Sequence, residues 1–130
     1  MKIKVNRSLK EEILNEMARI GFTDDGYEVY IRTDDPGNVP HFHYWDRETK
    51  GDKFHSCIGL DCPKYFLHEG KTDTLNHRQK KELVNLLKKS YRDTEKTLWD
   101  HLLMEWNDNN EHIKVDETTP MPNYMELSAE

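Results

Sequence analysis

The sequence predicts an α+β domain, in which a small antiparallel sheet of three to five strands packs against helices. Short segments of alternating apolar and polar residues follow one another over residues 27–67, which is typical of neighbouring antiparallel strands. Before and after them, over about residues 8–20 and 76–107, apolar residues recur at helical spacing. We therefore expect an N-terminal helix, the sheet, and one long or two C-terminal helices.

The N-terminal helix is expected over about residues 8–20. Ser8 and Glu11 have the spacing of a capping box, in which two side chains accept hydrogen bonds from backbone N–H groups at a helix start. Gly21 is a typical residue just beyond a helix C-terminus. The apolar stripe between them consists of Leu9, Ile13, Leu14, Met17 and Ile20.

The sheet is expected to contain strands at about residues 27–32, 40–46 and 54–60. Clusters of Asp, Asn, Pro and Gly separate them, and these residue types favour turns. A fourth, shorter strand at residues 65–67 is an open alternative.

The C-terminal half begins with a second helix start at Asn76 and Gln79. The apolar pattern then runs to Trp106, and we favour two helices joined near Asp93 over one long helix. Beyond it the chain is polar and holds two prolines, so we expect one domain over residues 1–107 and a mobile, acidic tail over 108–130.

Composition and charge restrict the class of protein. The chain has 130 residues and a net charge of -6, which argues against broad affinity for nucleic acid. We find neither a secretory leader nor an apolar run of the roughly 20 residues that span a bilayer, so we expect a cytoplasmic protein without membrane association. In that compartment the two cysteines are expected to be reduced thiols.

Four residues of the predicted sheet are candidate metal ligands. His41 and His43 are two apart on one strand and point to the same face, as do His55 and Cys57 on the next. Imidazole and thiolate groups are ligands for a divalent metal such as zinc. The relative register of the two strands decides whether the pairs converge, because a shift of one residue puts one pair on the opposite face.

Two other interpretations of these residues stay open. His41 and His43 could instead hydrogen-bond to the loop at residues 34–39 and orient it, in which case no cofactor is expected. Cys57 could also pair with either histidine as a nucleophile and base. No other feature of the sequence supports such a pair, so we name no catalytic residue.

Candidate partner-binding residues lie in the C-terminal half. Lys81, Lys88 and Arg92 are expected near one helical face, either as partner contacts or as a solvated surface. The acidic tail is typical of a docking segment, and its candidate contacts are Tyr124, Met125 and Leu127.

The segment Val39-Pro40-His41-Phe42-His43-Tyr44 is similar to the strand signature of a family of short bacterial proteins that is catalogued only as a domain of unknown function. The C-terminal Leu102-Leu103-Met104-Glu105-Trp106-Asn107 resembles that family's Leu-Leu-x-x-Trp-Asn pattern. The resemblance covers about residues 27–107. It implies a prokaryotic or phage source and a partner encoded by a neighbouring gene, as in toxin–antitoxin pairs, and it implies no known activity.

Three functional hypotheses follow. We favour a small accessory protein that binds a protein partner, in a toxin–antitoxin-like or host-defence-modulating role, because no convincing catalytic set is present; a homodimer is an alternative form of that partnership. The second hypothesis is a metal-dependent hydrolase or nuclease centred on His41 and His43. The third is an inhibitor whose acidic surface imitates nucleic acid.

Overall fold

The computed structural model describes residues 17–32, 39–67 and 72–127. They form an α+β fold, which confirms the predicted class. The elements are β1 (Met17–Phe22), β2 (Tyr27–Arg32), β3 (His41–Asp46), β4 (His55–Gly59), α2 (His77–Leu87), α3 (Leu98–Asn109) and the 3₁₀ helix η2 (Tyr124–Glu126).

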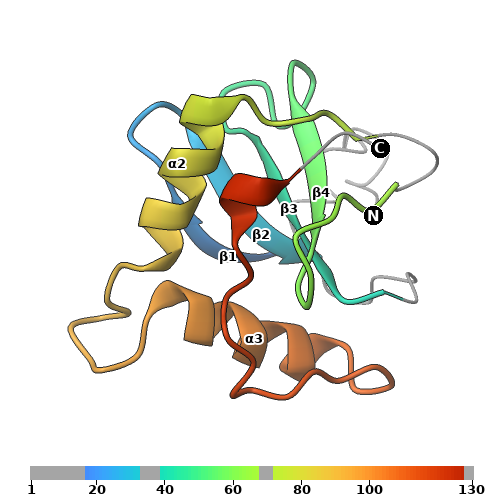
Figure 1. Cartoon of the computed structure of the whole chain (residues 1–130), viewed down its shortest axis with the longest axis vertical. Coiled ribbons are helices and arrows are strands. Elements are labelled where there is room, and N and C mark those ends of the chain that lie inside the picture. The colour runs from blue at the N-terminus through green and yellow to red at the C-terminus, as the bar shows by residue number, and fades with distance from the viewer. Residues whose placement is uncertain (1–16, 33–38, 68–71, 128–130) are drawn as a thin grey trace, which may run out of the picture.

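The four strands form an antiparallel sheet in the order β1-β2-β3-β4, so that each strand pairs with the next one along the chain (Figure 1). Tyr30 of β2 lies opposite His43 of β3, and His43 lies opposite Cys57 of β4. Residues that are paired in this way point to the same face of a sheet. Tyr30, His43 and Cys57 therefore form a row across one face.

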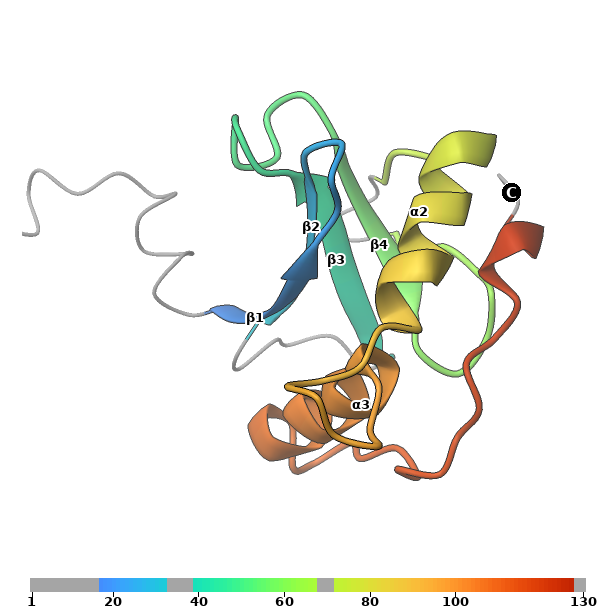
Figure 2. The same ribbon diagram turned by 90° about the vertical axis from the view of Figure 1, so that its left-hand side faces the viewer.

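The opposite face of the sheet carries the hydrophobic core. Figures 1 and 2 show α2 and η2 on one side of the sheet, with α3 crossing below them. Burial of these apolar side chains is the main force that holds the helices to the sheet. The core includes Val29, Ile31, Phe42, Tyr44 and Ile58 from the strands and Leu83, Leu87, Leu102, Leu103 and Trp106 from the helices.

The prediction of an N-terminal helix over about residues 8–20 is wrong for residues 17–20. Residues 17–20 belong to β1, which pairs with β2 and buries Ile20, whereas residues 8–16 lie outside the described residues. Residues 23–26 form a short connection, so β1 and β2 pair as a hairpin. The backbone of β1 therefore finds its hydrogen-bond partners in β2. Gly21 does not end a helix; a Cβ atom there would lie 3.2 Å from Leu98 Cδ1, so glycine lets α3 approach the strand.

The prediction of two C-terminal helices is confirmed. α2 begins with the predicted capping box of Asn76 and Gln79, and α3 begins with a second box formed by Thr97 and Asp100. The predicted strand at residues 65–67 is reduced to a single bridge between Tyr65 and Ile58. The strand that joins the three predicted ones in the sheet is β1, which pairs with β2.

The segment after α3 packs against the body, unlike the mobile tail that the sequence predicts. The Tyr124 side chain is fully buried, and Leu127 joins the core. The Trp99 indole N–H donates a hydrogen bond to the Thr119 carbonyl oxygen at 2.9 Å. An extended segment can dock through isolated apolar residues without helical periodicity, which explains why the sequence pattern did not indicate this packing.

Candidate metal centre

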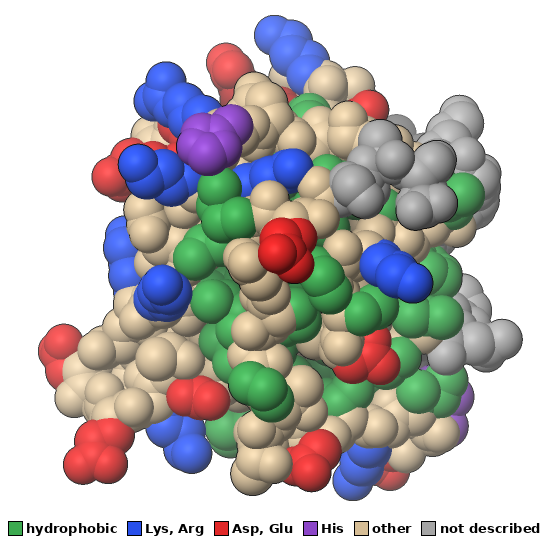
Figure 3. Space-filling view, in the orientation of Figure 1, with side chains coloured by type: hydrophobic (Ala, Val, Ile, Leu, Met, Phe, Trp, Pro, Cys, Tyr) green, Lys and Arg blue, Asp and Glu red, His purple; other side chains and the backbone are tan. Residues whose placement is uncertain are grey.

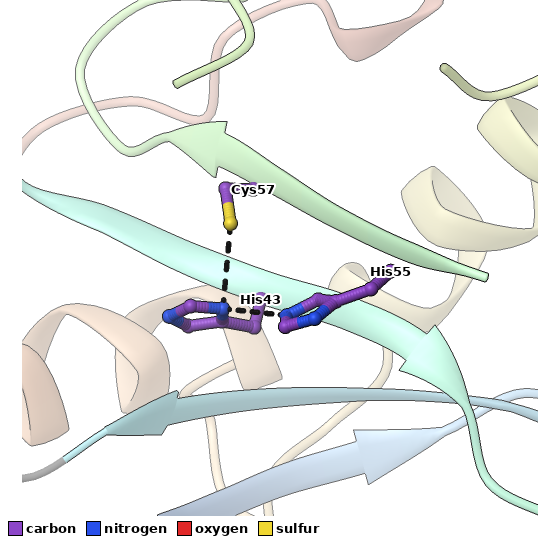
Figure 4. Close-up of side chains that lie close together, drawn as sticks. All are labelled: His43, His55 and Cys57. Atoms are coloured by element: carbon purple, nitrogen blue, oxygen red, sulfur yellow. Dashed lines mark hydrogen bonds between the residues drawn. The ribbon is translucent and has the colours of Figure 1, made fainter. Parts of the chain in front are cut away.

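Three of the four predicted ligands come together in the structure. The donor atoms of His43, His55 and Cys57 all lie within 4.8 Å of one another (Figure 4). They lie on the sheet face opposite the hydrophobic core, because His43 alternates along β3 with the core residues Phe42 and Tyr44. The group could hold a metal ion.

Two separations between the donor atoms are close to those of ligands around one small ion. His43 Nδ1 lies 2.9 Å from His55 Nε2 and 3.5 Å from Cys57 Sγ. Around tetrahedral zinc, nitrogen and sulfur donors at about 2.0–2.3 Å from the ion are about 3.3–3.6 Å from each other. Small side-chain adjustments would therefore bring all three atoms into coordination.

The sheet holds these side chains in place. His43 and Cys57 are directly paired across β3 and β4, and His55 is paired with Trp45. The His43 ring stacks on the Tyr30 ring, with centroids 4.8 Å apart and an interplanar angle of 14°. His43 is 1% exposed and Cys57 is 2% exposed. A group that is fixed in this way loses little conformational entropy when it binds an ion.

The chemistry of the donors selects the class of metal. Two neutral imidazoles and one thiolate suit zinc and other borderline or soft ions, whereas magnesium and calcium prefer oxygen ligands. The other thiol, Cys62, is outside the group, and burial together with the neighbouring Asp61 raises its pKa and disfavours its thiolate form. Cys57 is therefore the cysteine to consider as a ligand.

The contacts of His43 Nδ1 differ from those in the proton relay of a nucleophilic Cys–His pair. In such a relay, one ring nitrogen of the histidine faces the nucleophile, and the other bonds to the group that orients the histidine. Here a single atom, His43 Nδ1, faces both Cys57 Sγ and His55 Nε2. Donors that converge on one point are typical of ligands for a common ion.

His41 is not part of the group, although the sequence predicts it as a ligand. Its Nδ1 atom donates a hydrogen bond to the Val39 carbonyl oxygen at 2.7 Å. Its ring stacks on Phe66, with centroids 4.4 Å apart. For His41, the structure therefore favours the alternative interpretation, in which it anchors the end of the loop that precedes β3.

Tyr30, which the sequence did not indicate as a site residue, lies beside these donors: its hydroxyl oxygen is 3.2 Å from His55 Nε2. Tyr30 is on β2, and its place beside the donors depends on the register of three strands. The alternation of polar and apolar residues along β2 indicates which residues share a face. It does not indicate which residues of the next strand they meet.

A partly buried ion pair, with Glu28 buried and Arg19 about half exposed, continues the polar row on the same face. Glu28 accepts hydrogen bonds from Arg19 Nη1 at 2.9 Å and from the Trp45 indole N–H at 3.3 Å. These contacts fix Trp45, whose ring packs against His55 with centroids 5.5 Å apart. The ion pair thus supports the metal-centre side chains indirectly.

A surface cavity of about 620 Å³ lies elsewhere, beside the hairpin turns. None of the three donors lines it. A metal-dependent hydrolase needs space for substrate beside its ion, and the cavity does not supply that space. The lining residues are Asp25, Gly26, Tyr27, Asp46, Arg47, Glu48, Lys50, Lys53 and Phe54.

The predicted partner-binding residues divide into two groups. Lys81, Lys88 and Arg92 are exposed, whereas Tyr124 and Leu127 belong to the core. Met125, between these two, is partly buried. Only the basic residues are thus fully accessible to a partner. No helix of the described residues is both long enough and apolar enough to cross a membrane.

Fold and site define a small α+β protein with a candidate transition-metal centre on its sheet. Comparison with known proteins adds no family to this class: no family model, curated protein or solved structure matches the chain.

Proposed function

We propose that this protein binds one zinc ion through His43, His55 and Cys57. The observation that carries the proposal is the convergence of their three donor atoms within 4.8 Å. The three residues come from two paired strands, so the bound ion would link β3 to β4. Binding to the folded state alone stabilises that state, by about 2.7 kcal/mol at a free-ion concentration 100 times the dissociation constant.

Cobalt titration tests the proposal, because Co²⁺ adopts the same tetrahedral geometry and is coloured. Protein stripped of metal should show a thiolate-to-cobalt charge-transfer band when Co²⁺ is added, and excess Zn²⁺ should remove it. Cys57→Ser should abolish the band, and His43→Ala should weaken binding. The matched control is Cys62→Ser, which should behave as the wild type. Absence of the band in wild-type protein, or its loss in the Cys62 variant, contradicts the proposal.

Binding of a protein partner through α2 is a second candidate function, and one observation favours it. Exposed cations lie on α2 and in the turn after it, in a chain whose net charge is -6. Figure 3 shows Lys and Arg side chains gathered along the side of the molecule where α2 lies. The basic stripe consists of Arg78, Lys81, Lys88, Lys89 and Arg92.

Charge reversal tests this second candidate. The basic stripe fits a protein partner with an acidic surface. Binding of such a partner should therefore weaken as the salt concentration rises. Lys81→Glu combined with Lys88→Glu should abolish binding of a partner that the wild-type protein binds. The control is Lys50→Glu combined with Lys53→Glu, which makes the same charge change beside the surface cavity. Equal loss in both variants would point to net charge instead of the basic stripe.

A further inference from the structure

The proposed zinc centre needs a fourth ligand. Zinc sites in proteins are tetrahedral, and the group at His43, His55 and Cys57 supplies three donors. The fourth position decides the chemistry of the site. A water molecule there makes a catalytic centre, whereas a fourth side chain closes the coordination shell and makes a structural one.

Tyr30 is placed to occupy that position. It lies opposite His43 in the sheet, and its ring stacks on the His43 ring. Its hydroxyl oxygen reaches His55 Nε2, on β4, at 3.2 Å. That separation matches the 2.9 Å and 3.5 Å separations among the other donors. The distance from the Tyr30 oxygen to His55 Nε2 is therefore about the distance between two ligands of one ion.

Charge balance favours an anionic oxygen at this buried point. Tyr30 is 1% exposed, as is His43, and a net charge in such surroundings is costly unless it is balanced. Zn²⁺ with the Cys57 thiolate alone keeps one positive charge. A phenolate from Tyr30 cancels that charge, so the complete centre is neutral.

We infer that Tyr30 is the fourth ligand, through its phenolate oxygen, and that the zinc centre is closed. The inference rests on the proposed function. On binding, the Tyr30 O–H bond breaks, its proton passes to the solvent buffer, and the oxygen lone pair forms the bond to zinc. No electron transfer is involved. The closed shell makes the centre structural and leaves no zinc-bound water for hydrolysis.

The test compares Tyr30→Phe with Tyr44→Phe, which removes a buried hydroxyl group from the opposite face of the sheet. Zinc addition to wild-type protein should produce the ultraviolet difference spectrum of an ionised tyrosine. Tyr44→Phe should produce it as well, and Tyr30→Phe should not. Tyr30→Phe should still bind Co²⁺ through three residues, but more than about tenfold more weakly, and with altered d–d bands.

The outcomes separate the two claims. Cobalt binding by wild-type protein without ionised tyrosine, and with equal affinity and spectra in Tyr30→Phe, overturns the fourth ligand and leaves the zinc site standing. Failure of wild-type protein to bind cobalt or zinc overturns both. The ultraviolet measurement on wild-type protein decides the question even if Tyr30→Phe does not fold.

Discussion

The hydroxyl group of Tyr124 donates a hydrogen bond to the carbonyl oxygen of Gly59 at 2.7 Å, across a sequence separation of 65 residues. The bond is buried and joins η2 to the end of β4. Tyr124 also packs edge-on against Phe42 of the sheet. The C-terminal segment is in this way tied to the strand that carries His55 and Cys57.

Tyr124→Phe should therefore lower the free energy of unfolding by roughly 1–3 kcal/mol, because it leaves a buried carbonyl oxygen without its donor. Urea denaturation measures the change. Tyr91→Phe, in the partly exposed loop after α2, is the control and should change stability by less than about 0.5 kcal/mol. Equal effects would show that the buried bond contributes nothing of its own.

The same packing predicts that residues 110–127 resist limited proteolysis in the folded protein. The Lys80 ammonium group also donates to the Leu127 carbonyl oxygen at 2.5 Å, which holds the end of the segment to α2. Tyr124→Phe should increase the rate of cleavage within the segment. Rapid cleavage there in wild-type protein, with a folded core left over, would support the mobile tail that the sequence predicts.

Gly51→Ala should destabilise the β3–β4 hairpin. Gly51 has φ 89°, and an added Cβ atom would lie 2.5 Å from Trp45 Cε3. Gly26→Ala is a matched control, since Gly26 has φ 98° with no atom within 4 Å of the added carbon. The control should cost about 1–2 kcal/mol from backbone strain alone. Thermal or urea unfolding should show a larger loss for Gly51→Ala, and equal losses would mean that Trp45 moves aside freely.

Acidification should destabilise the fold through His101. Burial lowers the pKa of His101 below 6.5, and Arg92 acts in the same direction, whereas Glu105 opposes them. The unfolded chain therefore takes up this proton first, so stability falls as the pH drops below about 6.5 towards the folded pKa. The His101 ring also stacks on Tyr91, at 4.0 Å between centroids.

Urea unfolding at pH 7.5 and 5.5 measures this effect. His101→Gln should lose less stability between the two values than the wild type does. His112→Gln is the control, because His112 is exposed. An unchanged pH dependence in His101→Gln would contradict the assignment.

The sequence predicted the fold class and α2 well, because their signals are local. The Asn76 and Gln79 capping box and the apolar spacing after it depend on neighbours within a few residues. β1 was misread for the opposite reason. Met17 and Ile20 fit a helical stripe, and only pairing with β2 makes them a strand.

The candidate site was predictable in part. Period-two spacing placed His43 on one face of β3, and His55 with Cys57 on one face of β4. The register that joins them was not readable from the sequence, and neither was the contact with Tyr30. His41 satisfied the same spacing, but it lies two residues before His43, at the start of β3, and bonds to the backbone instead.

The most direct test of the zinc centre is a stoichiometric titration. Protein purified without a metal-affinity column and stripped with a chelator is titrated with Zn²⁺ against a chromophoric zinc indicator. The proposal predicts one tightly bound zinc ion per chain in the wild type and in Cys62→Ser, and loss of that ion in Cys57→Ser. Wild-type protein that fails to take zinc from the indicator, or a Cys57→Ser variant that still does so, would contradict it.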